Sequence, residues 1–122
     1  MNESGLLEPV AVLTLARMQK EAWQNSEDHG FHEKPDVGLP TRLMLIVSEL
    51  AEAMEEDRVG VRTNVTTITE SGKPEGVPSE LADVIIRVGD LAEVYGIDLE
   101  AAVVQKMNYN KSRPYKHGGK AY

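Results

Sequence analysis

Two pairs of acidic residues, each pair separated by three positions, are the feature of this sequence best suited to chemistry. Glu49 and Glu52 form the first pair, and Glu80 and Asp83 form the second. Residues three apart lie on the same face of a helix, so each pair would present two carboxylates side by side. One such pair is usually solvated surface charge. Two pairs on neighbouring helices would crowd four negative charges together, which predicts a bound cation because like charges oppose ionisation.

The ligand types favour a hard divalent cation. Carboxylate oxygens are common protein ligands of Mg²⁺, so we expect these four side chains to hold Mg²⁺, for which Mn²⁺ can substitute. The chain contains no cysteine, which excludes thiolate metal sites, a disulfide scaffold and a thiol nucleophile. It also lacks the Glu-x-x-His spacing of ferritin-like di-iron centres. Arg87 and Asp90 share the face of the second acidic pair, and we expect them to form salt bridges between helices.

A stripe of basic and amide side chains near the C-terminus could bind phosphate. Lys106, Asn110 and Arg113 recur at i, i+4 and i+7, which places them on one face of a helix. Lys116 and Lys120 follow in a glycine-containing extension. Taken alone, bases at a helix end are more typical of helix-dipole compensation and of a solvated tail. Beside a carboxylate-bound cation they fit a polyphosphate, which Arg binds through its planar guanidinium and Lys as a point charge.

Two aromatic residues are candidates to stack on a nucleobase through its π face. Trp23 lies at helical spacing among apolar residues, a position more typical of a protein core. Phe31 follows Gly30 in a predicted loop and is better placed to meet a ligand. Both are therefore candidate substrate-binding residues.

The charge of the 122-residue chain is unevenly distributed. Thirteen Lys and Arg against twenty Asp and Glu give a net charge of −7, yet residues 106–122 contain five bases and no acid. The net negative charge argues against a nucleic-acid-binding surface. With 41% hydrophobic residues the chain can bury one core, which predicts a single domain over residues 1–122. Its apolar N-terminal stretch is too short to span or target a membrane, so we expect a soluble cytoplasmic protein.

Four helices are predicted to position these residues, and the expected fold is an all-α four-helix bundle. The predicted ranges are 9–28, 40–58, 79–95 and 98–114. Pro9 suits the first turn of the first helix, and Ser79 and Asp98 are good N-cap residues for the third and fourth. Gly96 supplies a stop between these two helices, and Pro114 ends the last one.

Two stretches depart from this simple pattern. Residues 43–47 are apolar on every side of the second helix, as for a helix that is surrounded by protein. Residues 59–78 form a long connection rich in Gly and Pro, with β-branched residues in its middle. This composition predicts either a short hairpin or a mobile flap.

Taken together, the acidic pairs and the basic stripe resemble the MazG-like, all-α nucleoside triphosphate pyrophosphohydrolases. The resemblance extends from about Gly30 onward and rests on residues 45–53, 80–85 and 106–114. The acidic pairs match the family's E-x-x-E and E-x-x-D metal motif in order and type. The Lys-x3-Asn-x2-Arg stripe with its His-Gly-Gly-Lys ending is similar to a phage and bacterial branch. The chain departs from the family at Ser48, where the broad motif has the first of two adjacent glutamates.

The resemblance implies an activity, residue roles and a partner. The activity is Mg²⁺-dependent hydrolysis of a nucleoside or deoxynucleoside triphosphate between the α- and β-phosphates, giving the monophosphate and pyrophosphate. Glu49, Glu52 and Lys106 would take part in catalysis, while Arg113 neutralises phosphate charge and Asn110 orients a phosphate or sugar hydroxyl. Family members assemble as dimers or dimers of dimers. The alternative interpretation is a non-catalytic helical module that binds nucleotides or a protein partner.

Overall fold

The computed structural model describes residues 12–114, which form four helices and one two-stranded hairpin. The elements are α1 (Leu15–Asp28), α2 (Leu39–Arg58), β1 (Thr67–Ile68), β2 (Pro74–Glu75), α3 (Val77–Val94) and α4 (Leu99–Lys111). The predicted helical class and number of helices are therefore confirmed for this part of the chain. The connection after α2 contains the short hairpin, in which Thr67 pairs with Glu75 in antiparallel register. No helix within residues 12–114 is long and apolar enough to cross a membrane.

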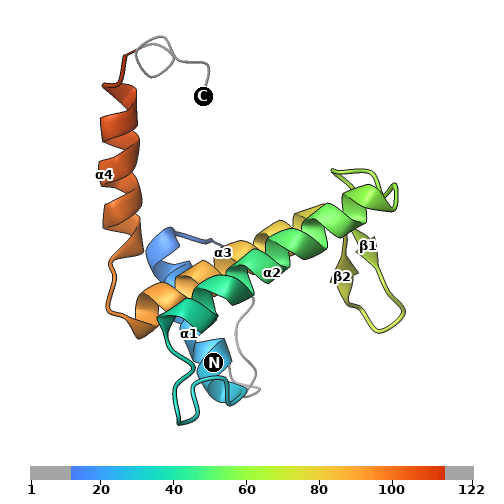
Figure 1. Ribbon diagram of the computed structural model, residues 1–122, viewed down its shortest axis with the longest axis horizontal. Coiled ribbons are helices and arrows are strands. Elements are labelled where there is room, and N and C mark those ends of the chain that lie inside the picture. The colour runs from blue at the N-terminus through green and yellow to red at the C-terminus, as the bar shows by residue number, and fades with distance from the viewer. Residues whose placement is uncertain (1–11, 115–122) are drawn as a thin grey trace.

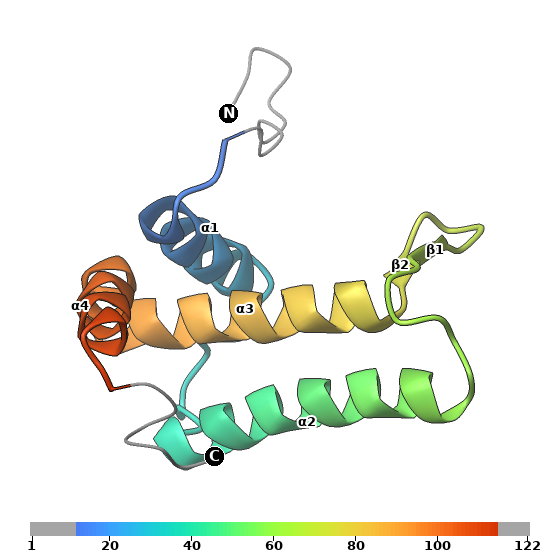
Figure 2. The same cartoon turned by 90° about the horizontal axis from the view of Figure 1, so that it is seen from above.

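Helix α3 is the centre of the fold, with α1 on one side and α2 on the other (Figure 2). Helices α2 and α3 run side by side and antiparallel, because the hairpin segment reverses the chain between them (Figure 1). Pro40 lies in the first turn of α2, where its missing N–H leaves no helical hydrogen bond unmade. The end of α2 at Arg58 agrees with the predicted range.

The packing of α1 against α3 forms much of the small core. Met18 and Ala22 of α1 are buried, as are Gly89 and Ala92 of α3. A Cβ atom added at Gly89 would lie 2.5 Å from Met18 Sδ and 3.3 Å from the Cα of Gln19. Glycine at this position therefore allows the backbones of the two helices to approach closely.

Helix α4 leaves the other three helices instead of packing along them. It runs across the end of α3 and projects away from the pair formed by α2 and α3 (Figures 1 and 2). None of its residues, Leu99–Lys111, is buried. The helices that pack side by side in one chain are thus α1, α2 and α3, so the predicted bundle of four is not formed by these residues within a single copy.

The turn between α3 and α4 follows the predicted stop and start signals. Gly96 adopts φ +66°, and the N–H groups of Gly96 and Ile97 donate to the carbonyls of Glu93 and Ala92. This is the hydrogen-bond pattern by which a glycine in the left-handed region ends a helix. Asp98 then caps α4 by accepting a hydrogen bond from the Ala101 N–H at 3.0 Å.

Two predicted helix starts differ from the structure, the first by six residues and the third by two. The first helix begins at Leu15, where Thr14 Oγ1 accepts from the Arg17 N–H at 3.1 Å; Pro9 lies outside the described residues. The third helix begins at Val77 because Gly76, at φ +123°, is its N-cap. The Ser79 hydroxyl instead donates to the Pro74 carbonyl at 3.1 Å and joins the helix to the hairpin.

The beginning of α2 is less covered than its sequence predicts. Leu43, Met44 and Val47 are between 48% and 62% exposed in the single chain. The last helix also ends earlier than predicted, at Lys111 rather than near Pro114, with Ser112 as its C-cap.

Candidate metal centre

Three glutamate side chains from two helices converge on one point. Glu49 and Glu52 come from α2, and Glu80 comes from the first turn of α3. One carboxylate oxygen from each of the three residues lies within 4.8 Å of the other two. Glu49 and Glu52 lie on one face of α2 because they are three residues apart, and the antiparallel packing of α3 brings Glu80 to that face. We call these three residues the acidic triplet. Three of the four predicted metal ligands are therefore brought together, in a donor set that suits a hard divalent cation.

Arg87 balances one member of the acidic triplet. Its Nε–H donates to Glu49 Oε1 at 2.8 Å across the α2–α3 interface. Burial acts to raise the pKa of Glu49, but the hydrogen bond and the positive charge of Arg87 outweigh it and hold that pKa below its usual value. Glu49 is therefore an ionised carboxylate at neutral pH, and the predicted salt bridge of Arg87 between helices is confirmed.

Glu80 is in the opposite electrostatic situation. Burial, followed by the neighbouring carboxylates of Glu52 and Glu49, raises the pKa of Glu80 to about 7. Its Oε2 atom is buried and has no hydrogen-bond partner among residues 12–114. A buried acceptor with no partner is costly, and either a proton or a cation would satisfy it. The unpartnered Oε2 atom of Glu80 therefore distinguishes the triplet from ordinary exposed acidic side chains.

The fourth predicted ligand, Asp83, is not part of the triplet. It lies one turn after Glu80 on α3 and is exposed. Partial burial, followed by the negative charge of Glu49, raises the pKa of Asp83. The negative charge of Glu49 therefore acts on the Asp83 carboxyl group. The role of Asp83 as a metal ligand stays a prediction.

A cavity of about 360 Å³ opens beside the triplet. Its walls come from the end of α2, the hairpin and the start of α3, and its lining residues are Glu52, Glu55, Glu56, Val59, Lys73, Glu75 and Glu80. Lys73 brings a positive charge to this acidic hollow, and its Nζ lies 4.0 Å from Glu75 Oε1. The sequence did not single out Lys73, because its position depends on the β1–β2 pairing. The connection 59–78 thus forms a wall of the candidate site.

Ser48 stands immediately before Glu49 but contributes nothing to the acidic triplet. The Ser48 hydroxyl donates to the Leu45 carbonyl one turn earlier at 2.6 Å. The side chain is exposed and engaged with its own helix. It adds no negative charge to the neighbouring triplet.

The basic stripe of α4 does not meet the acidic triplet within one chain. Lys106 and Arg113 both lie over the ring of Tyr109, at 5.2 and 5.9 Å from its centroid. Helix α4 follows the C-terminal end of α3, whereas Glu80 is in the first turn of α3. The fourteen residue-to-residue steps from Glu80 to Val94 correspond to about 21 Å of helix. Two further predicted phosphate-binding residues, Lys116 and Lys120, lie outside the described residues.

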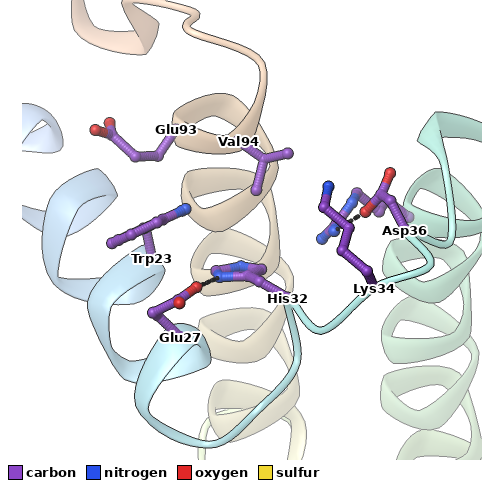
Figure 3. A pocket seen from close by; sticks show the side chains of 8 residues that line it. Trp23, Glu27, His32, Lys34, Asp36, Glu93 and Val94 are labelled. Atoms are coloured by element: carbon purple, nitrogen blue, oxygen red, sulfur yellow. Dashed lines mark hydrogen bonds and ion pairs between the residues drawn. The ribbon is translucent and has the colours of Figure 1, made fainter.

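A second cavity, of about 540 Å³, contains one of the two aromatic candidates (Figure 3). Trp23 stacks on His32 with ring centroids 5.3 Å apart and lines this cavity. The two ring nitrogens of His32 each lie 2.8 Å from a carboxylate oxygen, one of Glu27 and one of Asp90. Through His32, Asp90 links α3 to the loop between α1 and α2. The Oδ2 atom of Asp90 also lies 3.9 Å from Nη1 of Arg42. Phe31 is 69% exposed and does not line this cavity.

Comparison with known proteins identifies no relative of this chain. The chain matches no family model, no curated protein and no solved structure. Any functional assignment therefore depends on its own motifs and on the site that they form.

Proposed function

We propose that this chain is a Mg²⁺-dependent nucleoside triphosphate pyrophosphohydrolase of the MazG-like type. The substrate is a nucleoside or deoxynucleoside triphosphate, and cleavage between its α- and β-phosphates gives the monophosphate and pyrophosphate. The observation that carries the proposal is the acidic triplet with its buried, unpartnered Glu80 oxygen. The residues of the triplet are also those that match the family's acidic motif.

The residues present fit a divalent cation. Glu49, Glu52 and Glu80, with Asp83 one turn away, would hold Mg²⁺ or Mn²⁺ through carboxylate oxygens. When bound, such an ion would supply charge neutralisation for phosphate oxygens and a lowered pKa for a coordinated water. The cation would also remove the need for a proton on Glu80.

The protein's own groups account for the remaining requirements of phosphate hydrolysis. Glu52 is the exposed member of the triplet and borders the 360 Å³ cavity, so its carboxylate can accept the proton of the attacking water. The water oxygen then bonds to the α-phosphorus as the bridging oxygen departs with pyrophosphate. Arg87 keeps Glu49 ionised through this change.

The basic stripe has the chemistry to hold the triphosphate. Lys106 and Arg113 would neutralise the negative charge that moves onto the leaving pyrophosphate, and Asn110 would orient a phosphate or sugar hydroxyl. Lys116 and Lys120 extend this basic set in the sequence. Trp23 and Phe31 stay candidates to stack on the nucleobase. Trp23 lines the 540 Å³ cavity.

We also propose that the protein works as a homodimer or a dimer of dimers, without nucleic acid or membrane as a partner. The half-exposed apolar side chains at the start of α2 support self-association, because contiguous apolar surface of this kind usually marks an interface.

The deciding experiment is pyrophosphate release from a panel of ribo- and deoxyribonucleoside triphosphates, with and without Mg²⁺. We expect release with at least one nucleotide, only in the presence of metal, and its loss in Glu52→Gln. Glu70→Gln is the matched control, because Glu70 is an exposed glutamate of the hairpin segment outside the triplet. Stabilisation by a nucleotide without any hydrolysis would instead favour the non-catalytic nucleotide-binding module. No hydrolysis and no nucleotide binding would overturn both.

A further inference from the structure

The β1–β2 hairpin has a regular shape although it buries almost nothing. Both of its strands, Thr67–Ile68 and Pro74–Glu75, are exposed, and Ile68 is 62% exposed. The hairpin lies at the end of the α2–α3 pair, beside the last turn of α2 (Figure 1). A segment that buries so little apolar surface adds little to the stability of the core. Its regular structure therefore suggests a role at the neighbouring acidic cavity.

The turn of the hairpin sets the register of its strands. The Gly72 N–H donates to the Thr69 carbonyl, and the Thr69 N–H donates to the Lys73 carbonyl, both at 2.9 Å. Gly72 adopts φ +87°, the left-handed conformation that closes a three-residue hairpin loop. The Lys73 N–H also donates to Thr69 Oγ1 at 3.1 Å. The position of Lys73 in the second strand is thus fixed by Thr69 and Gly72.

The base of the hairpin is held against the start of α3. Gly76 is buried, and a Cβ atom added there would lie 2.5 Å from the carbonyl oxygen of Val65. The hydrogen bond from the Ser79 hydroxyl to the Pro74 carbonyl adds a second connection. The hairpin therefore has a defined position relative to the first turn of α3, which contains Glu80.

This position and register direct Lys73 to the acidic cavity. Residues two apart in a strand point to the same face, so Lys73 and Glu75 share one, and both line the 360 Å³ cavity together with Glu52 and Glu80. Burial and the charge of Glu49 raise the pKa of Asp83, and Lys73 is one of two cations that oppose this rise. The Lys73 ammonium group therefore lies within electrostatic range of the predicted metal ligands.

The Lys73 ammonium group is not engaged by a hydrogen bond to its neighbour Glu75. The 4.0 Å between Lys73 Nζ and Glu75 Oε1 exceeds hydrogen-bond distance, and the Lys73 side chain is 72% exposed. Of the seven lining residues in the described part of the chain, five are glutamates and one, Lys73, is a base. An anionic ligand that enters this cavity would therefore meet its positive charge at Lys73.

We propose that Lys73 binds a phosphate group of a polyphosphate whose other oxygens meet the cation at the acidic triplet. That this polyphosphate belongs to a nucleoside triphosphate rests on the proposed function. A lysine ammonium is a compact charge with three donors on a flexible stem, which suits phosphate oxygens. Within residues 12–114 of one chain, Lys106 and Arg113 lie beyond the far end of α3, whereas Lys73 borders the triplet. The hairpin thus supplies a phosphate-binding cation from the same chain.

The binding test uses inorganic tripolyphosphate in the presence of Mg²⁺, because this probe carries the phosphate chain without a nucleobase. Isothermal titration at about 150 mM salt, where the Debye length is about 8 Å, suppresses effects of distant charges. We expect the Kd to rise at least tenfold in Lys73→Met and less than threefold in Lys73→Arg, which keeps the charge. Lys20→Met, which removes an exposed lysine of α1, is the matched control and should bind as the wild type does. Equal affinities of the wild type and Lys73→Met would overturn the proposal.

A second measurement separates phosphate binding from an effect on the metal centre. Lys73→Met removes a positive charge near the triplet, so Mn²⁺ alone should bind at least as tightly as in the wild type. Circular dichroism should show unchanged helix content, because the side chain is exposed. Weaker binding of Mn²⁺ alone in Lys73→Met would show that Lys73 shapes the metal centre instead, and would contradict the proposal.

Kinetics distinguish this proposal from the proposed function. If the protein releases pyrophosphate, Lys73→Met should raise KM by a similar factor for every nucleotide of the panel, because Lys73 meets phosphate and not the base. Hydrolysis with an unchanged KM would overturn the role of Lys73 and leave the proposed function standing. Tripolyphosphate binding that depends on Lys73, without hydrolysis of any nucleotide, would do the reverse. A wild type that binds no tripolyphosphate contradicts the role of Lys73 directly.

Discussion

Arg87 of α3 donates its Nε–H to Glu49 Oε1 of α2 at 2.8 Å, so one carboxylate of the acidic triplet already has a cationic partner. Glu80, its neighbour in the triplet, has a buried oxygen with no hydrogen-bond partner in the part of the chain that the structure describes. The triplet is therefore electrostatically uneven, with one member that is held ionised and one that favours a proton or a cation.

Replacement of Arg87 should destabilise the fold through Glu49. Arg87→Met keeps much of the side-chain volume but leaves a buried carboxylate unpaired, and we expect the free energy of unfolding at neutral pH to fall by about 1–3 kcal/mol. The pKa of Glu49 is lowered, so the stabilisation is present above its unfolded value and is lost as pH falls through its folded value. The difference between the two proteins in urea unfolding should therefore shrink in acid.

The control for this substitution is Arg58→Met. Arg58 is exposed and pairs with Glu55 three residues away on the same helix, so its loss should cost no more than about 0.5 kcal/mol. Equal urea midpoints for the wild type and Arg87→Met would contradict the role assigned to Arg87.

The contribution of Glu80 to the free energy of unfolding should depend on pH with the opposite sign. Its pKa in the folded protein is raised to about 7, above the ordinary value of 4.5. Its contribution to stability is therefore complete below pH 4.5 and is lost as pH rises through about 7. Glu80→Gln cannot ionise, so without divalent metal its stability relative to the wild type should increase between pH 5 and pH 8.

Urea midpoints measured at several pH values across this range provide the check. Glu70→Gln, in the exposed hairpin segment, should follow the wild type at every pH. A constant difference between the wild type and Glu80→Gln would show that Glu80 does not titrate in this range.

Metal binding at the acidic triplet can be measured without any substrate. We expect Mn²⁺ to lose its free-ion electron paramagnetic resonance signal on addition of the protein, and excess Mg²⁺ to restore it. Glu49→Gln and Glu80→Gln remove triplet ligands and should each weaken Mn²⁺ binding about tenfold or more. Glu70→Gln should bind as the wild type does. Undiminished binding in both triplet variants would place the ion elsewhere.

The acidic triplet was predictable because its determinants are local. A spacing of three on α2 and an acidic first turn on α3 suffice once the two helices are neighbours. The hydrogen bonds around Gly96 and Asp98 are similarly local, and both predictions are confirmed. At the start of α3, Gly76, Pro78 and Ser79 are all plausible boundary residues. The sequence could not choose among them, because the choice depends on how the hairpin packs.

The close approach of α1 and α3 was not predictable, since nothing in the helical pattern distinguishes Gly89 from any other small residue. The structure shows that a Cβ atom there would lie 2.5 Å from Met18 Sδ. Gly89→Ala should therefore lower the free energy of unfolding by about 1–3 kcal/mol, although alanine is the better helix former. Removing the obstructing side chain in Met18→Ala should make the double variant lose less stability than the sum of the single losses. Additive losses in urea unfolding would show that the two residues do not compete for space.

The direction of α4 was the other feature beyond the sequence, because it depends on a contact some eighty residues apart. Gln19 is buried on α1, and its Nε2 donates to Glu93 Oε2 at 2.8 Å and to the Ile97 carbonyl at 2.7 Å. Its Oε1 also accepts from the Leu99 N–H. One amide side chain thus joins α1, the end of α3 and the start of α4.

Gln19→Met should release the start of α4 while filling a similar volume. The substitution leaves the Ile97 carbonyl and the Leu99 N–H without their partner, and we expect a loss of about 1–3 kcal/mol in unfolding free energy. Hydrogen exchange should accelerate at the Leu99 amide in particular, because its hydrogen bond is removed directly. Gln24→Met provides the control, since Gln24 is exposed and donates to Asp28 of its own helix. If Leu99 exchanged equally fast in the wild type and both variants, Gln19 could not be the anchor of α4.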